Sequence, residues 1–292
     1  MNLFADPLMQ RALIVALLVG LSAPVIGTYL VQRRMALLGD GIGHVALAGV
    51  AAGWLAGSLA HFTQRDALAL PGAVVFAVAA AVTIERLRAR GTSPADVAMA
   101  ILFYGGIAGG VLLIGAAGGT STNLLGYLFG SISTVTWADV WLTIALSGLI
   151  LAVGLGLRHA LFAVTHDQDF ATASGLPVRT LNLVVAVLAA VTITVSMRVV
   201  GVLLVSGLMI LPVAIAQQMT RAFARTMALA MGIGAILTVT GLTITYYRNL
   251  QPGALIVVLG VGAYAIAATV RSIVSANGGR VAAEASNGVE HG

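Results

Sequence analysis

One acidic residue and one histidine stand four residues apart in an otherwise apolar stretch of the sequence. The stretch follows two arginines and reads MALLGDGIGHVALAGVAAGWLAG, with Asp40 and His44 as its ionisable residues. On a helix, side chains four residues apart project from the same face, so a carboxylate oxygen and an imidazole nitrogen can reach one point. This mixed pair suits zinc, manganese or ferrous iron better than copper(I), which prefers sulfur. Asp40 and His44 are therefore predicted metal ligands.

Two ligands do not complete a metal site. A tetrahedral or octahedral ion needs at least two more, and a symmetric dimer with this helix at its interface would supply a second Asp–His pair. The alternative is structural: Asp40 lies near the membrane surface and pairs with Arg33 or Arg34, while His44 makes a buried hydrogen bond. An intramembrane carboxylate is costly, which makes it a functional-site hypothesis by default.

The composition places these residues in a membrane protein. Of 292 residues, 59% are hydrophobic and only 9% are charged, whereas soluble proteins carry about 25% charged residues. The absence of cysteine excludes thiolate metal sites and thiol catalysis. The absence of lysine removes the Gly-Lys-Ser/Thr phosphate loop, so this chain is not itself a P-loop ATPase. The arginines punctuate apolar segments instead of clustering on one face, which argues against a nucleic-acid partner.

Nine uncharged apolar windows are long enough to cross roughly 30 Å of hydrocarbon. The predicted fold is all-α and polytopic, with about nine transmembrane helices (eight possible) in a single domain over residues 1–275. If the second helix enters the bilayer at Met35, His44 lies about 14 Å along its axis, near the midplane. The windows are 12–31, 37–60, 67–84, 97–117, 138–157, 180–197, 199–219, 226–247 and 252–270.

The arginines predict the orientation of these helices. With nine spans and the N-terminus outside, eleven arginines lie inside and four outside, a clear positive-inside bias. If the window 199–219 were re-entrant, the later loops would change sides and the division would become eight against seven.

Two segments are predicted not to span the membrane. Residues 118–136 hold an apolar core too short to cross, and a re-entrant or interfacial helix on the outer face fits them better. The segment 276–292 is small, polar and glycine-rich, and is predicted to be a disordered cytoplasmic tail.

The inner loop after the fifth window contains a predicted short helix over residues 167–174. Asp167 and Asp169 suit the positive end of its dipole, Gly175 can adopt the left-handed conformation that ends a helix, and Pro177 blocks its continuation. Asp169, Ala171 and Gly175 form a D-x-A-x-x-x-G pattern. An exposed helix at this place could dock a soluble partner; the alternative is a solvated surface turn.

Taken together, these segments resemble the zinc/manganese/iron permease family of ABC importers. The resemblance covers roughly residues 10–270, and the glycine-rich version around Asp40 and His44 looks most like zinc-uptake members. The matching blocks are Ala23-Pro24, Arg33-Arg34-Met35, Gly39-Asp40…His44…Gly49, Asp167…Ala171…Gly175, and Val200-Gly201…Leu211-Pro212.

The resemblance implies a type II importer-like homodimeric pore in the cell membrane. Two cytoplasmic ATPase subunits and an extracytoplasmic metal-binding protein would be its partners, and ATP would be used by the ATPase subunits, with no cofactor in this chain. Asp40 and His44 would coordinate the transported metal, zinc first and manganese or iron as alternatives. Residues 167–175 would couple to the ATPase. The rivals are a proton-coupled secondary metal carrier, an ABC permease for a larger cargo such as a metal chelate or vitamin, and a membrane scaffold.

Overall fold

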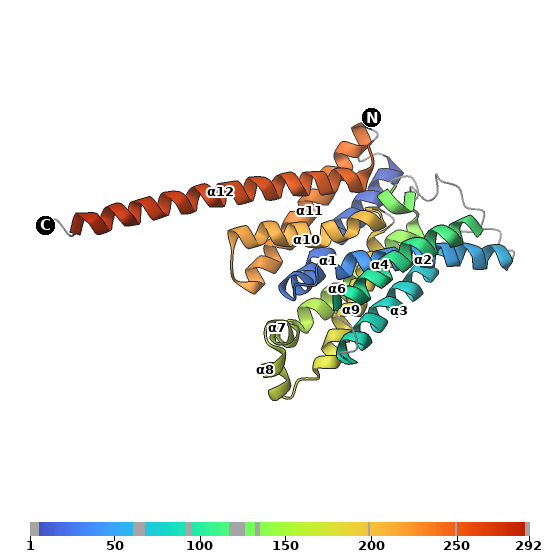
Figure 1. The fold of residues 1–292 in the computed structure, drawn as a ribbon. Helices are drawn as coiled ribbons and strands as arrows, with labels where there is room; N and C mark the ends of the chain where they lie inside the picture. The colour runs from blue at the N-terminus through green and yellow to red at the C-terminus, as the bar shows by residue number, and fades with distance from the viewer. Residues whose placement is uncertain are drawn as a thin grey trace.

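The computed structural model describes residues 6–60, 68–90, 95–116, 126–131, 135–197, 199–248 and 250–289. Every regular element in these ranges is helical, which confirms the predicted all-α class (Figure 1). A helical turn at residues 126–129 stands between α4 and α6. The helices are α1 (Pro7–Gln32), α2 (Leu38–Leu59), α3 (Ala69–Arg90), α4 (Ala95–Ala116), α6 (Trp137–Gly156), α7 (Arg158–His166), α8 (Gln168–Ala173), α9 (Val178–Ser196), α10 (Val202–Met219), α11 (Phe223–Arg248) and α12 (Pro252–Val289).

Within the described residues, eight helices are long and apolar enough to cross a membrane. They are α1, α2, α3, α4, α6, α9, α11 and α12, and each coincides with one predicted window. The remaining window, 199–219, corresponds to α10, whose apolar part Leu204–Met219 is shorter than the others.

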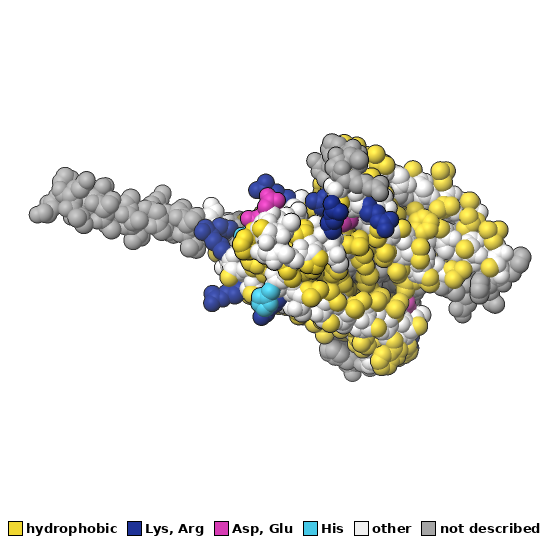
Figure 2. Space-filling model, turned by 90° about the horizontal axis from the view of Figure 1, so that it is seen from below, with side chains coloured by type: hydrophobic (Ala, Val, Ile, Leu, Met, Phe, Trp, Pro, Cys, Tyr) yellow, Lys and Arg dark blue, Asp and Glu magenta, His cyan; other side chains and the backbone are white. Residues whose placement is uncertain are grey.

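The bundle has two distinguishable ends. At one end, which we call the inner end, the ring of Phe223 at the start of α11 lies 5.5 Å from Tyr29 of α1 and 4.8 Å from Phe162 of α7. Arginine and histidine side chains gather on the face that carries α7 and α8, beside a largely hydrophobic surface (Figure 2). At the opposite, outer end, the hydroxyl of Tyr246 lies 3.4 Å from the carboxylate of Asp6, which caps α1.

The short helix α10 packs against α1, α2, α11 and α12. It begins after Gly201, whose φ of +86° and close approach to the backbone of Phe129 leave no room for a side chain. It ends near α12, where the Arg271 guanidinium donates a 3.0 Å hydrogen bond to the Gln218 side chain. At its start, Val202 lies beside Gly43 of α2. Helix α10 is not among the eight described helices that are long enough to span, so the choice between nine passes and the re-entrant alternative stays a prediction.

The helices differ sharply in how much of them the protein covers. The most apolar windows of α1 and α2 are 72% and 67% buried, whereas those of α12 and α4 are 17% and 22% buried. Helix α1 packs against α6, α9, α10 and α11, and α2 packs against α3, α4, α9 and α10. The predicted metal helix therefore lies inside the bundle, and α4 and α12 leave most of their surfaces to lipid or to another chain.

The two segments predicted not to span have different outcomes. Most of residues 118–136 lies outside the described residues; the part that is described includes the turn 126–129 at the outer end. Helix α12 continues to Val289, and the disordered cytoplasmic tail over residues 276–292 stays a prediction. Extension of an existing helix adds one backbone hydrogen bond for each residue that it fixes, so it needs no packing partner to begin.

Candidate functional site

Helix α2 presents the two predicted ligands near its inner end. Asp40 lies in its first turn and His44 one turn further on, so the two side chains share a face. The helix begins at Leu38, which places His44 about 9 Å along a helix of about 33 Å. The site thus lies in the first third of α2, and its depth in the membrane stays a prediction.

His44 is enclosed by the neighbouring helix α4. Its side chain is only 7% exposed, and its ring meets Phe103 edge-on, with centroids 4.3 Å apart and planes at 77°. A Cβ at Gly106 would lie 2.7 Å from the backbone carbonyl carbon of His44, so α4 approaches α2 at this residue as closely as glycine allows. This packing of α4 restricts the orientations that the His44 imidazole ring can adopt.

The imidazole retains an unused polar atom. Nδ1 of His44 is buried and has no hydrogen-bond partner among the described residues. Buried polar atoms are nearly always paired, so an unpaired ring nitrogen calls for an explanation. A metal ion is one such partner, because a neutral imidazole nitrogen ligates zinc, manganese and iron.

Asp40 does not form the structural pair that the alternative interpretation requires. Its side chain is half-buried, and no ion pair or hydrogen bond engages its carboxylate in the part of the chain that the structure describes. Arg33 instead donates from Nε to the Thr165 hydroxyl of α7 at 3.1 Å. The carboxylate is therefore available to a ligand.

One copy of the chain does not complete a metal site. No group of three or more histidine, cysteine, aspartate or glutamate side chains stands close enough to hold an ion in the described ranges. Asp40 and His44 supply two donors, and the remaining ligands of a bound ion have to come from outside this set.

The predicted short helix after α6 is present as α8. The Asp167 carboxylate accepts a 2.9 Å hydrogen bond from the backbone N–H of Phe170 and so caps the helix. Gly175 has a φ of +77°, and the N–H groups of Gly175 and Leu176 bond back to Thr172 and Ala171. These contacts confirm the predicted start and stop.

One side of α8 is exposed, and the opposite side packs against the bundle. Ala171 is fully buried beneath the helix, whereas Asp169 faces solvent and Phe170 is 65% exposed. Phe170 therefore places an apolar ring on the exposed surface between Asp167 and Asp169. The role of Asp167, Asp169, Ala171 and Gly175 in coupling nevertheless stays a prediction.

Sequence reasoning missed helix α7, which precedes this segment. Residues 158–166 were predicted as part of a loop, yet they form a helix that buries Leu161 and Val164 against the core. The i, i+3 spacing of these two apolar residues was the available signal. The helix also carries Thr165, the partner of Arg33.

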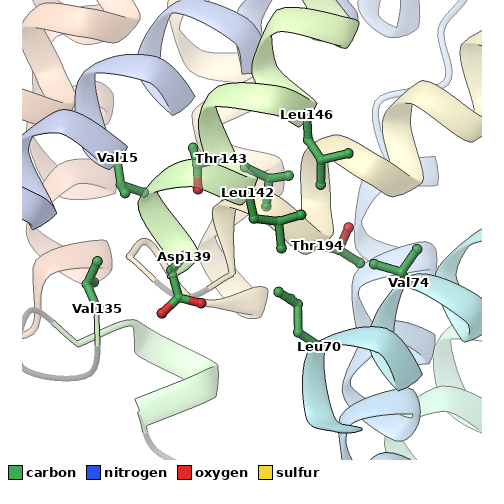
Figure 3. Close-up of a pocket in the computed structure, with 10 residues that line it drawn as sticks. Val15, Leu70, Val74, Val135, Asp139, Leu142, Thr143, Leu146 and Thr194 are labelled. Carbon is green, nitrogen blue, oxygen red and sulfur yellow. The ribbon is translucent and has the colours of Figure 1, made fainter. Parts of the chain in front are cut away.

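A second enclosed carboxylate has a structural role. Figure 3 shows Asp139 beside a cavity of about 10 Å³ that is bounded by residues of α1, α3, α6 and α9, among them Thr143 and Thr194. The Asp139 carboxylate accepts hydrogen bonds from the backbone N–H and the hydroxyl of Thr136, at 2.9 and 2.7 Å. This reciprocal capping box begins α6, so the carboxylate is used by the fold.

Comparison with known families decides what kind of protein carries this site. The model of the ABC 3 transport family matches residues 5–271. The chain belongs to the ABC 3 transport family. As a member of this family it is a multi-pass membrane permease rather than an enzyme, and the resemblance inferred from the motifs is confirmed.

Individual relatives of this ABC 3 permease cover nearly its whole length. The manganese transport system membrane protein MntC of Listeria innocua is 32% identical over 251 residues, 86% of each chain. The chelated iron transport system membrane protein YfeD of Yersinia pestis is 30% identical over 257 residues, 88% of this chain and 83% of its own. A chain in the structure of PsaBC from Streptococcus pneumoniae in complex with Fab superposes with a TM-score of 0.80 and 30% identity, covering 91% of this chain and 92% of that one.

Proposed function

We propose that this ABC 3 permease is the membrane-spanning subunit of an ATP-driven importer of divalent transition metal ions. The observation that carries the proposal is the pair on α2, one helical turn apart: a carboxylate and a buried imidazole nitrogen, neither of which has a hydrogen-bond or ion-pair partner among the residues that the structure describes. Its membership of a transport family supplies the context in which such a pair handles cargo.

The pore in this proposal is formed with a second copy of the chain. Two copies related by a two-fold axis would bring two Asp–His pairs together, which gives four donors and satisfies a tetrahedral ion or most of an octahedral one. The poorly buried helices α4 and α12 leave surface for such an interface, and α4 already lies against His44.

In this proposal, ATP hydrolysis at the inner end of the bundle drives transport. Two cytoplasmic ATPase subunits dock on the exposed face of α8, and their closure on ATP moves the segment 167–175. A metal-binding protein docks on the outer loops, among them the predicted outer segment 118–136, and delivers the ion to Asp40 and His44. Alternating exposure of the pair to the two sides carries the ion inward.

The identity of the metal rests on relatives more than on the ligands. An oxygen and an imidazole nitrogen suit manganese, iron and zinc alike, so Asp40 and His44 do not separate these ions. The sequence around them favours zinc, whereas the relatives described above are named for manganese and for chelated iron. Manganese is therefore the first ion to test, with iron and zinc beside it.

The test is transport by the complete complex in proteoliposomes, supplied in turn with Mn²⁺, Fe²⁺ and Zn²⁺. We expect ATP-dependent uptake of at least one of the three ions, and a loss of at least about tenfold in His44→Ala, since even indirect perturbation of a metal ligand costs this much. The matched control is His159→Ala, which removes an exposed histidine of α7 and leaves uptake unchanged. Uptake by the permease without any ATPase subunit would instead identify a secondary carrier.

A further inference from the structure

The turn over residues 33–37, which joins α1 to the metal helix α2, makes side-chain contacts with two other helices, α7 and α3. Its backbone is tightly closed: the N–H of Met35 bonds to Leu30, the N–H of Leu38 bonds to Met35, and Arg34 has a φ of +57°, which is uncommon outside glycine. Helix α2 begins directly after this turn, so a displacement of the turn displaces Asp40.

On one side, the turn is tied to the helix that leads into α8. The Arg33 Nε–H donates a 3.1 Å hydrogen bond to the Thr165 hydroxyl, which in turn donates to the Leu161 carbonyl within α7. Thr165 stands two residues before Asp167, the cap of α8. Burial lowers the pKa of Arg33 to about 10, which still leaves its guanidinium charged at neutral pH, so the bond is charge-assisted.

On the other side, the turn is tied to α3. The Arg88 Nη1–H donates to the sulfur of Met35 at 2.9 Å, and the same guanidinium pairs with Glu85 at 3.5 Å. Glu85 is only 8% exposed, and its negative charge favours the nearby charged form of Arg33. Helix α3 packs along α2, so this contact holds the turn in register with the metal helix.

These contacts differ in what they connect. The Arg88–Met35 contact joins the turn to a helix that already packs along α2, whereas the Arg33–Thr165 bond joins it to the segment that carries α8. We propose that the Arg33–Thr165 bond transmits movement of α8 to Asp40 and His44, which makes Arg33 a positioning residue for transport. This inference rests on the proposed function of α8 as the ATPase contact.

The experiment compares metal moved with ATP consumed by the complete complex in proteoliposomes, with Mn²⁺ as the probe. Thr165→Val removes the hydroxyl while keeping the shape of the side chain, and Arg33→Gln removes the charged donor. We expect each to lower the Mn²⁺ transported per ATP by about fivefold or more, the range of ordinary coupling between sites. The double variant should be no worse than either single variant, because both remove the same bond.

Two further variants separate coupling from packing. Thr165→Ser restores the hydroxyl and should restore the Mn²⁺:ATP ratio. Thr83→Val is the matched control, because Thr83 on the exposed side of α3 makes the same bond to the carbonyl four residues earlier, to Ala79; it should leave the ratio unchanged.

Two results would overturn the inference. The first is an unchanged Mn²⁺:ATP ratio in Thr165→Val and Arg33→Gln; if the melting temperature of the complex fell at the same time, the bond would serve stability alone. The second is a pair of effects that multiply in the double variant. Failure of the proposed function itself is distinguishable, since the unmodified complex would then show no ATP-dependent uptake.

Discussion

The metal helix α2 and the segment α7–α8 satisfy their polar groups in opposite ways. In α8, the N-terminus is capped by Asp167, Thr172 bonds back to Gln168, and the C-terminal carbonyls are closed by the N–H groups after the Gly175 stop. In α2, Nδ1 of His44 is buried without a partner and Asp40 is unpaired among the described residues. The termini of α8 are satisfied within the segment itself, whereas α2 keeps polar atoms that the described residues leave unpaired.

This contrast indicates where each region does its work. A short helix whose bonds are all local can move as one body, which suits a contact with an ATPase. A half-buried carboxylate and a buried imidazole nitrogen without partners among the described residues suit a cargo site, because a bound ion would offset their desolvation. Substitutions in α2 should therefore abolish handling of the metal, and substitutions in α8 should weaken its coupling to ATP.

The largest effect is expected from removing the donors on α2. Asp40→Ala, alone or with His44→Ala, should lower ATP-dependent Mn²⁺ uptake by about 100-fold, because a lost ligand costs more than the 10- to 100-fold of a lost supporting contact. Uptake into cells that produce the complete complex provides the measurement. Normal uptake in the double variant would remove α2 from the mechanism.

A smaller effect is expected where α4 approaches His44. Gly106→Ala should destabilise the folded complex by about 1–3 kcal/mol, because the new methyl group meets backbone atoms of α2 that have no room to shift. The adjacent Gly105→Ala is its control, since a Cβ there meets nothing within 4 Å. Thermal melting of the purified complex in detergent compares them, and equal melting temperatures would contradict the close contact.

The stop of α8 provides the next test. Gly175→Ala should cost about 1–2 kcal/mol locally, because its φ of +77° is unfavourable for a residue with a Cβ. Nothing lies near the position of that Cβ, so backbone conformation alone is tested. We expect faster amide hydrogen exchange in residues 168–174 and a lower Mn²⁺:ATP ratio, with Gly175→Asn less affected. An unchanged exchange rate would show that the stop does not hold the helix.

The smallest effect is expected at the start of α8. Asp167→Ala removes the cap and should cost about 1 kcal/mol, whereas Asp167→Ser keeps a capping oxygen. Stimulation of ATP hydrolysis by the loaded binding protein should fall in the first variant and persist in the second. If both variants behaved alike, the carboxylate would act through its charge rather than as a cap.

The sequence predicted the features that depend on local or solvent chemistry. The spans follow from apolar length, and the start and stop of α8 follow from Asp167 and Gly175, because each depends on residues adjacent in the chain. The family followed from motifs spread along the chain, and the family model confirms it.

Features that depend on contacts between distant segments were missed. The enclosure of His44 by Phe103 and Gly106, and the bond from Arg33 to Thr165, join residues that are far apart in sequence. The continuation of α12 from residue 270 to Val289 was also not predicted, because the apolar window ends at residue 270.

The most direct test of the central claim is the amount of manganese bound by the purified permease complex after equilibration with Mn²⁺ and removal of excess ion. If Asp40 and His44 of two copies form one site, the complex should hold about one Mn²⁺ for two permease chains. Its electron paramagnetic resonance signal should show coupling to imidazole nitrogen, and the Asp40→Ala/His44→Ala variant should hold none above background. Undiminished binding with the same nitrogen coupling in that variant would contradict the account.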